Sequence, residues 1–121
     1  MKRINNYFPA NVNIPIDAKI SVKNLSSPRT GEPVKNQFCI FIPLAGITHF
    51  QSYDTTCLVY DWECRVLTVY PEAFSYSNTT SKYSRAFLRD EIGLDDSDVD
   101  NIRKLAKTES FGRDCPLYLQ L

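Results

Sequence analysis

Three basic side chains recur at helical spacing in the second half of the chain. Lys82, Arg85 and Arg89 lie three and four residues apart, and residues so spaced share one stripe of a helix. Asp90 follows Arg85 by five residues, which is a poor spacing for an ion pair. The stripe is therefore a candidate site for phosphate groups. The same residue types also make up the solvated face of an ordinary helix.

Aromatic residues are the second group that suits binding, with seven Tyr, seven Phe and one Trp in the chain. Many fall in strand-like segments among basic residues. On a strand, aromatic rings flanked by basic residues can stack on the bases of single-stranded nucleic acid. They equally suit core packing and cross-strand pairing. The aromatic residues concerned are Phe38, Phe41, Phe50, Tyr53, Tyr60, Trp62 and Tyr70, and the basic ones are Lys19, Lys23, Lys35 and Arg65.

The tryptophan stands apart from the other aromatic residues. Trp62 lies between Asp61 and Glu63 in a short connection between two strand-like segments, which predicts a hairpin tip where burial is difficult. An exposed tryptophan is a typical anchor of protein–protein contacts, whereas flanking acids make it a poor contact for nucleic acid. We therefore expect Trp62, Asp61 and Glu63 to contact a partner protein.

Catalytic residues and cofactor motifs are not expected. His49 is the only histidine, and no nucleotide-binding glycine motif, H-E-x-x-H or G-x-S-x-G occurs. The acid-rich run at 95–100 lacks the glycine and the final glutamate of a calcium loop. The sequence thus predicts a protein that is not an enzyme and that uses no cofactor.

The cysteines do not predict a metal site. Cys57 and Cys64 are the closest pair and are separated by six residues, whereas zinc sites favour two to four. A site would need three cysteines together with His49. We expect the cysteines to be free and to pack as small hydrophobic residues. They are Cys39, Cys57, Cys64 and Cys115.

The charge balance argues against bulk capture of duplex DNA. Lys plus Arg and Asp plus Glu both number 14, so the formal net charge is zero, whereas duplex binders are typically basic. The helix expected after Gly93 also begins with several aspartates, which would meet phosphates in a helix–turn–helix arrangement. These acids complement the helix dipole instead.

Membrane association and export are not expected. No run of 18 apolar residues occurs, so no transmembrane helix is predicted. The first 20 residues are interrupted by Asn and Pro and lack the apolar stretch of a signal peptide. The cytoplasm is the expected compartment.

These candidate residues need an α+β fold to position them. Alternating and continuous apolar runs predict an antiparallel meander of about five strands, and an apolar face at helical spacing predicts helices after Pro71. Asn78, Thr79 or Thr80 is the expected N-cap of the first helix, and Asp95 that of the second. The expected strands are 18–24, 38–42, 47–53, 55–61 and 64–70, followed by a helix over 79–92, a second short helix, and a C-terminal edge strand. Residues 1–17 are expected to form an extended arm, and 18–121 a single α+β domain.

Three short segments between residues 28 and 107 form a recognisable pattern. They are Thr30, Gly31, Pro33, Val34, Asn36, Gln37 and Phe38; Phe50, Gln51, Ser52 and Tyr53; and Tyr76, Ser77, Thr79, Thr80, Ser81, Lys82, Tyr83, Phe87 and Leu88. In these segments the chain resembles small proteins of gut bacteriophages and related mobile elements. The resemblance implies no established activity, but it implies a viral gene setting in which small domains act by binding.

Taken together, these features predict a non-enzymatic accessory protein that contacts a host or viral protein. The alternative is a single-stranded nucleic-acid-binding protein that uses the sheet aromatics and the Lys82, Arg85 and Arg89 stripe. A structural component of a larger assembly is a further alternative.

Overall fold

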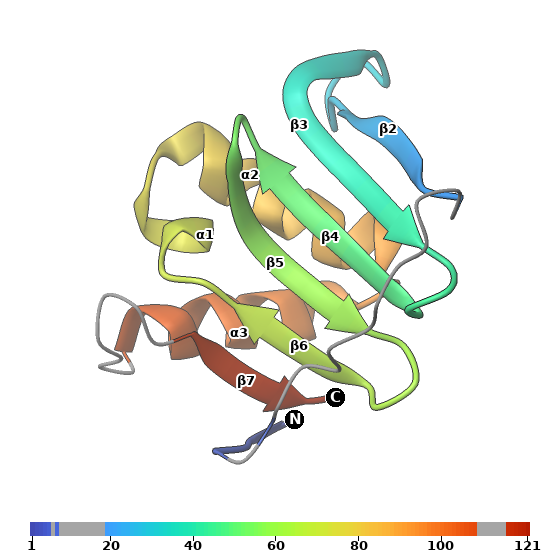
Figure 1. The fold of residues 1–121 in the computed structure, drawn as a ribbon. Helices are drawn as coiled ribbons and strands as arrows, with labels where there is room; N and C mark the ends of the chain where they lie inside the picture. Colours follow the sequence, from blue (N-terminus) through green and yellow to red (C-terminus); the bar gives the residue numbers. More distant parts are fainter. Residues whose placement is uncertain (6, 8–18, 109–115) are drawn as a thin grey trace.

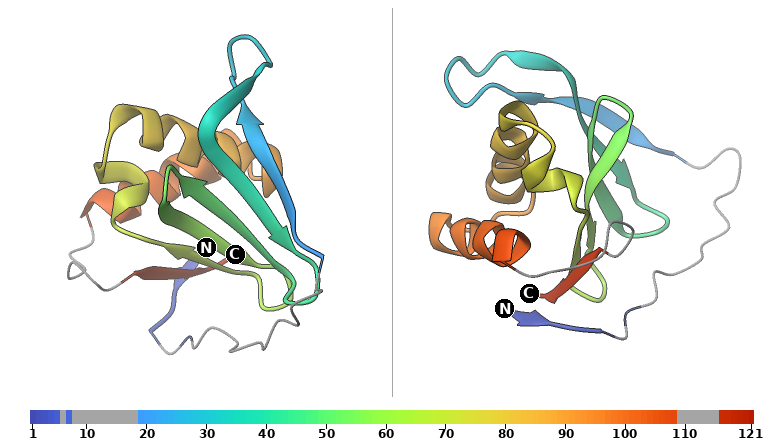
Figure 2. Two further views of the ribbon diagram at one scale, coloured as in Figure 1. Left: turned by 45° about the horizontal axis from the view of Figure 1, so that its top comes forward. Right: turned by 90° about the vertical axis from the view of Figure 1, so that its left-hand side faces the viewer.

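The computed structural model describes residues 1–5, 7, 19–108 and 116–121. In this part of the chain, a seven-stranded antiparallel sheet carries helices on one face (Figures 1 and 2). The strand order is β1-β7-β6-β5-β4-β3-β2. The strands are β1 (Lys2–Arg3), β2 (Ser21–Ser26), β3 (Pro33–Ile42), β4 (Ile47–Ser52), β5 (Thr55–Asp61), β6 (Val66–Val69) and β7 (Leu117–Gln120). The helices are α1 (Glu72–Ser75), α2 (Asn78–Ala86), the π-helix η1 (Phe87–Glu91) and α3 (Asp96–Thr108).

The predicted α+β class and the C-terminal strand are confirmed. The sheet has more strands than expected because the short β1 pairs with β7, with Lys2 opposite Gln120 and Arg3 opposite Leu119. The predicted arm therefore contributes an edge strand at its start. Most of the rest of that arm, and Cys115, lie outside the described residues.

The meander from β2 to β6 forms by pairing of neighbouring strands, as the alternating sequence pattern indicates. Side chains of successive strand residues point to opposite faces. One face therefore collects the apolar residues that pack under the helices. Phe50 of β4 and Phe87 of η1 stack across this boundary with ring centroids 5.8 Å apart. The rest of the core includes Leu58, Leu67, Val69, Leu88, Ile102, Leu117 and Leu119.

The helical layer starts and ends at other residues than expected. Ser77 is the N-cap of α2, since its hydroxyl accepts a 3.0 Å hydrogen bond from the Thr80 backbone N–H. The predicted cap at 78, 79 or 80 is wrong because Asn78 is already helical and the Thr80 hydroxyl instead bonds Ser52 of β4 at 3.0 Å. This buried contact ties α2 to the sheet.

The predicted helix over 79–92 divides into two parts. The chain leaves α2 directly into the π-helix η1, and Gly93 follows with a φ of 87°, a conformation that glycine adopts without steric cost. The short α1 was not expected. The predicted cap of α3 is confirmed, because Asp95 Oδ1 accepts a 2.8 Å hydrogen bond from the Asp98 N–H.

Candidate binding pocket

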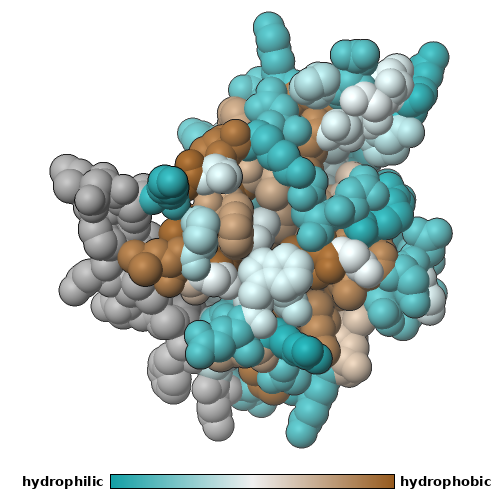
Figure 3. All heavy atoms as spheres, turned by 90° about the vertical axis from the view of Figure 1, so that its right-hand side faces the viewer, coloured by the Kyte–Doolittle hydropathy of each residue, from teal (hydrophilic) through white to brown (hydrophobic). Residues whose placement is uncertain are grey.

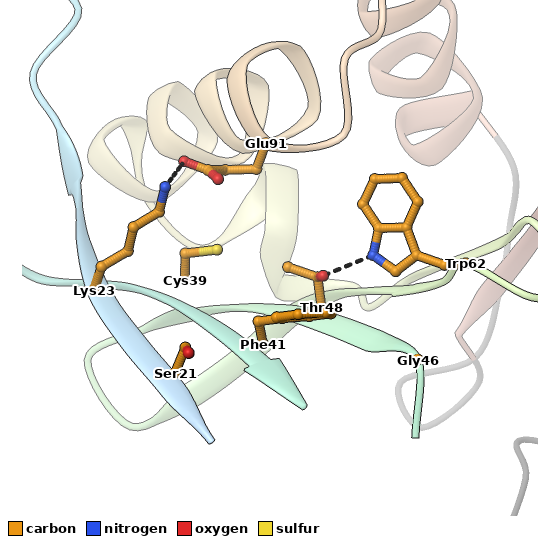
Figure 4. Close-up of a pocket in the computed structure, with 8 residues that line it drawn as sticks. All are labelled: Ser21, Lys23, Cys39, Phe41, Gly46, Thr48, Trp62 and Glu91. Carbon is orange, nitrogen blue, oxygen red and sulfur yellow. Dashed lines mark hydrogen bonds and ion pairs between the residues drawn. The ribbon is translucent and has the colours of Figure 1, made fainter. Parts of the chain in front are cut away.

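A pocket of about 520 Å³ lies between the helix-facing side of the sheet and η1. Its floor comes from β3 and β4, and η1 faces this floor from the other side (Figure 4). Figure 3 views the molecule from the side on which β2 and β3 lie, and apolar atoms cross the middle of that face between hydrophilic ones. The lining residues are Ser21, Lys23, Cys39, Phe41, Gly46, Thr48, Trp62 and Glu91.

Strand register brings the floor residues together. Phe41 of β3 lies directly opposite Thr48 of β4 and Ser21 of β2, and Cys39 lies opposite Lys23. All of these residues are on the face that also carries Phe50. Cys39 is only 4% exposed, whereas Phe41 is 39% exposed. The helical layer therefore covers Cys39 and leaves the end of β3 open.

Trp62 forms one end of the pocket and is held in place by three contacts. Its indole Nε1 donates a 2.8 Å hydrogen bond to Thr48 Oγ1. Its ring meets Tyr60 edge to face at a centroid distance of 4.8 Å. Its backbone N–H donates to the Gly46 carbonyl at 2.9 Å. The side chain is 44% exposed, so Trp62 is anchored at its polar atom while much of the indole remains accessible.

An ion pair forms the opposite end of the pocket. Lys23 Nζ lies 2.9 Å from Glu91 Oε1, and the two side chains are 61% and 21% exposed. The hydrogen bond that Lys23 donates to the Glu91 carboxylate raises the pKa of Lys23. Burial, with a smaller contribution from the nearby Glu91 charge, raises the pKa of the Cys39 thiol to about 11. The thiol in the pocket floor is therefore protonated and uncharged at neutral pH.

The acids that flank Trp62 have different positions. Asp61 is 5% exposed, and its carboxylate accepts hydrogen bonds from the backbone N–H groups of Glu63 and Cys64 and from the Tyr7 hydroxyl. Burial and the Asp61 carboxylate raise the pKa of Tyr7. Asp61 thus orders the β5–β6 turn. Glu63 is exposed, but it does not line the pocket.

The three basic residues of the predicted stripe are exposed on α2 and η1. Lys82 Nζ lies 5.5 Å from the Tyr83 ring centroid, and Arg85 Nε donates to the Ser81 carbonyl at 3.4 Å. Arg89 is close to two carboxylates, at 3.5 Å from Asp90 and 3.7 Å from Asp96. None of the three lines the pocket.

The sheet aromatics do not form one continuous surface. Phe50 and Tyr60 are buried in the core, so their ring faces are not available to bases. Phe38 lies one residue from Cys39 and therefore faces away from the side that carries Phe41. The exposed members are Phe41, Tyr53 and Trp62, and two of these line the pocket.

Within the described residues, no three potential metal ligands gather in one place. Cys39 and Cys57 are buried free thiols, and Cys64 is an exposed one. His49 lies opposite Ile40 and Val59, on the sheet face away from Cys39. Burial lowers the pKa of its imidazole.

Sequence reasoning identified Trp62 but missed the surroundings that it shares. Glu91 comes from a helix, and Thr48 and Phe41 meet only through the register of β3 with β4. The hairpin signal at 38–53 could have suggested the Phe41–Thr48 pair. Nothing in the sequence pattern indicates that Glu91 approaches Lys23.

No helix in the described part of the chain is long and apolar enough to cross a membrane.

The model of one protein family, described as a family of unknown function (DUF8033), matches residues 20–104. The match runs from the residue before β2 to the last turns of α3 and includes every residue that lines the pocket. Searches of curated proteins and of solved structures gave no match.

Proposed function

The chain belongs to the DUF8033 family, whose function is unknown, and we propose that it is a non-enzymatic binding protein that receives a side chain of a partner protein between Phe41 and Trp62. The observation that supports this most is the position of Trp62. Its polar atom is satisfied by Thr48, and its apolar ring remains accessible beside an exposed phenylalanine.

The size and lining of the pocket suit binding. Ligand pockets commonly span about 300–1,000 Å³ and combine apolar walls with a few polar groups, and the volume of about 520 Å³ falls in this range. Tryptophan is enriched among residues that dominate binding energy at protein interfaces. Its rigid anchoring by Thr48 lowers the entropy that ordering the side chain would cost on binding.

Support for a binding role rather than a catalytic one comes from the ionisable groups of the pocket. The Cys39 thiol has a pKa of about 11, so little nucleophilic thiolate is present at neutral pH. Lys23 and Glu91 are paired with each other. The histidine, His49, faces away from the pocket.

The resemblance to proteins of gut bacteriophages adds a setting to this proposal. The partner would be a host or viral protein, met in the cytoplasm of the host cell. Under this proposal the protein acts as an accessory factor through its surface, and Trp62 with Phe41 provides the contact.

Selection of random peptides displayed on phage tests the proposal directly. The immobilised wild-type protein should select a convergent set of sequences, and these peptides should bind Trp62→Ala and Phe41→Ala at least tenfold more weakly. Tyr76→Ala is the matched control, because Tyr76 is exposed and lies outside the pocket. Peptides that bind all variants equally, or the lack of any convergent set, would contradict the proposal.

The second candidate function is single-stranded nucleic-acid binding. It is favoured by Lys82 and Arg85, which are exposed and have no acidic partner among the described residues. Phosphate binding releases counterions, so the affinity should fall steeply with salt. Fluorescence anisotropy with a labelled oligonucleotide at 50 and 200 mM salt should then detect binding that Lys82→Gln/Arg85→Gln removes. No binding at low salt would eliminate this function.

A structural role in a larger assembly is the third candidate. It predicts self-association, which light scattering at several protein concentrations measures. A monomer at all concentrations would argue against it.

A further inference from the structure

We propose that the pocket selects a basic side chain of the partner protein, with arginine as the best fit, and that Lys23 occupies the place of the incoming cation while the partner is absent. The inference rests on the proposed function and names the chemistry that the pocket recognises. It is carried by the unequal exposure of the Lys23–Glu91 pair and by the aromatic residues that share the pocket with it.

The two charged residues among those that line the pocket differ in their access to water. Lys23 is the more exposed member of the pair and Glu91 the more enclosed one. An exposed ion pair contributes little free energy, so Lys23 can leave it and be hydrated at low cost. A partly enclosed carboxylate, in contrast, is costly to leave without a partner. A guest is therefore expected to replace Lys23 and keep Glu91.

An anionic guest would meet the opposite situation. It would bring a second negative charge next to Glu91, and like charges at close range in a partly desolvated site repel each other. The neighbouring Cys39 thiol is uncharged and offers no compensation. Once Lys23 has been displaced, the remaining charge of the pocket, on Glu91, therefore favours a cation over an anion.

The apolar part of the pocket distinguishes an arginine from a small cation. Lys23 and Glu91 stand at one end of the pocket and Trp62 at the other, with Phe41 in the floor between them (Figure 4). A planar guanidinium that takes the place of Lys23 donates two parallel hydrogen bonds to the Glu91 carboxylate. The apolar stem of the arginine then suits contact with Phe41 in the floor, with Trp62 at the far end of the pocket.

Trp62 allows a direct test, because it is the only tryptophan in the chain and its emission reports on the pocket. The wild-type protein is titrated with Nα-acetyl-arginine amide. The matched probe is Nα-acetyl-citrulline amide, which has nearly the same shape without the charge, and Nα-acetyl-glutamate amide is the anionic probe. We expect a saturable change in emission with the arginine probe, in the millimolar range typical of a ligand of that size.

Three variants then test the role of each charge. Lys23→Thr removes the internal competitor, and we expect it to tighten binding of the arginine probe by about two- to fivefold, the factor that corresponds to a weak exposed ion pair. Glu91→Gln should weaken binding about tenfold or more, because it removes a charge-assisted hydrogen bond. Lys35→Thr is the matched control, since Lys35 is an exposed lysine of β3 outside the pocket.

Several results would overturn this inference. It is overturned if the citrulline probe binds as tightly as the arginine probe, or if the glutamate probe binds more tightly. It is also overturned if the arginine probe binds Lys23→Thr more weakly than the wild type, or if no probe gives a saturable signal. Circular dichroism and thermal melting establish that each variant is folded. If displayed peptides converge on Trp62 but contain no basic residue, this inference fails while the proposed function stands.

Discussion

The indole Nε1 of Trp62 donates a 2.8 Å hydrogen bond to Oγ1 of Thr48, which joins the residue after β5 to the second residue of β4. This contact satisfies the polar atom of an otherwise apolar ring. It also fixes the ring beside Phe41, so the pocket exists before any partner is bound.

Thr48→Val should loosen Trp62 while preserving side-chain shape. Loss of the acceptor should lower the free energy of unfolding by about 1 kcal/mol, the usual contribution of one hydrogen bond. Urea unfolding measures the stability, and a red shift of the Trp62 emission measures the changed surroundings of the indole. Thr56→Val is the control, since the Thr56 side chain makes no hydrogen bond within the part of the chain that the structure describes. An unchanged emission spectrum in Thr48→Val would show that the bond does not position the ring.

Phe50→Ala and Phe41→Ala should differ strongly in their effects on stability. Phe50 is fully buried against Phe87, so its truncation leaves a cavity and should cost about 3–5 kcal/mol. Phe41 is partly exposed in the pocket, and we expect its truncation to cost less than about 1.5 kcal/mol. Urea unfolding of both variants is the measurement. A similar loss for both would mean that Phe41 is a core residue and would weaken its assignment to binding.

His49 should make the protein less stable in mild acid. Burial between Ile40 and Val59 lowers the pKa of the folded imidazole below its ordinary value of 6.5. The unfolded chain therefore binds a proton at His49 more readily than the folded protein does. The free energy of unfolding consequently decreases as the pH falls below about 6.5. Urea unfolding at pH 7.5 and pH 5.5 should show a larger loss for the wild type than for His49→Gln. Equal losses would exclude His49 as the cause.

Tyr53→Gly should stabilise the β4–β5 hairpin. Tyr53 has a φ of 56°, a left-handed conformation that costs a non-glycine residue about 1–2 kcal/mol. Glycine removes this strain but adds about 0.5–1 kcal/mol of entropy cost, so we expect a net gain of up to about 1.5 kcal/mol. Asp54→Gly is the control because the backbone of Asp54 is not left-handed, and it should destabilise. Differential scanning calorimetry measures both. A lower melting temperature for Tyr53→Gly would show that the Tyr53 side chain contributes more than the strain removes.

Local patterns in the chain were enough to predict the α+β class, the meander from β2 to β6 and the cap of α3. Alternation of apolar and polar residues specifies a strand and its buried face, because successive side chains point to opposite sides. Asp95 as a cap follows from one side chain and a backbone N–H three residues away. The cap of α2 could not be predicted in the same way, because the Thr80 hydroxyl forms a hydrogen bond with Ser52 of β4, which is far away in the sequence.

The pocket was decided by the tertiary structure. The sequence by itself determined that Trp62 follows a strand and lies beside acids, and from this it predicts a tip that points to solvent. Only the folded chain places Thr48 within hydrogen-bond distance of the indole and Glu91 within 2.9 Å of Lys23. These contacts join residues that are far apart in sequence. They depend on strand register and on where a helix crosses the sheet, and a local pattern of residue types determines neither of these.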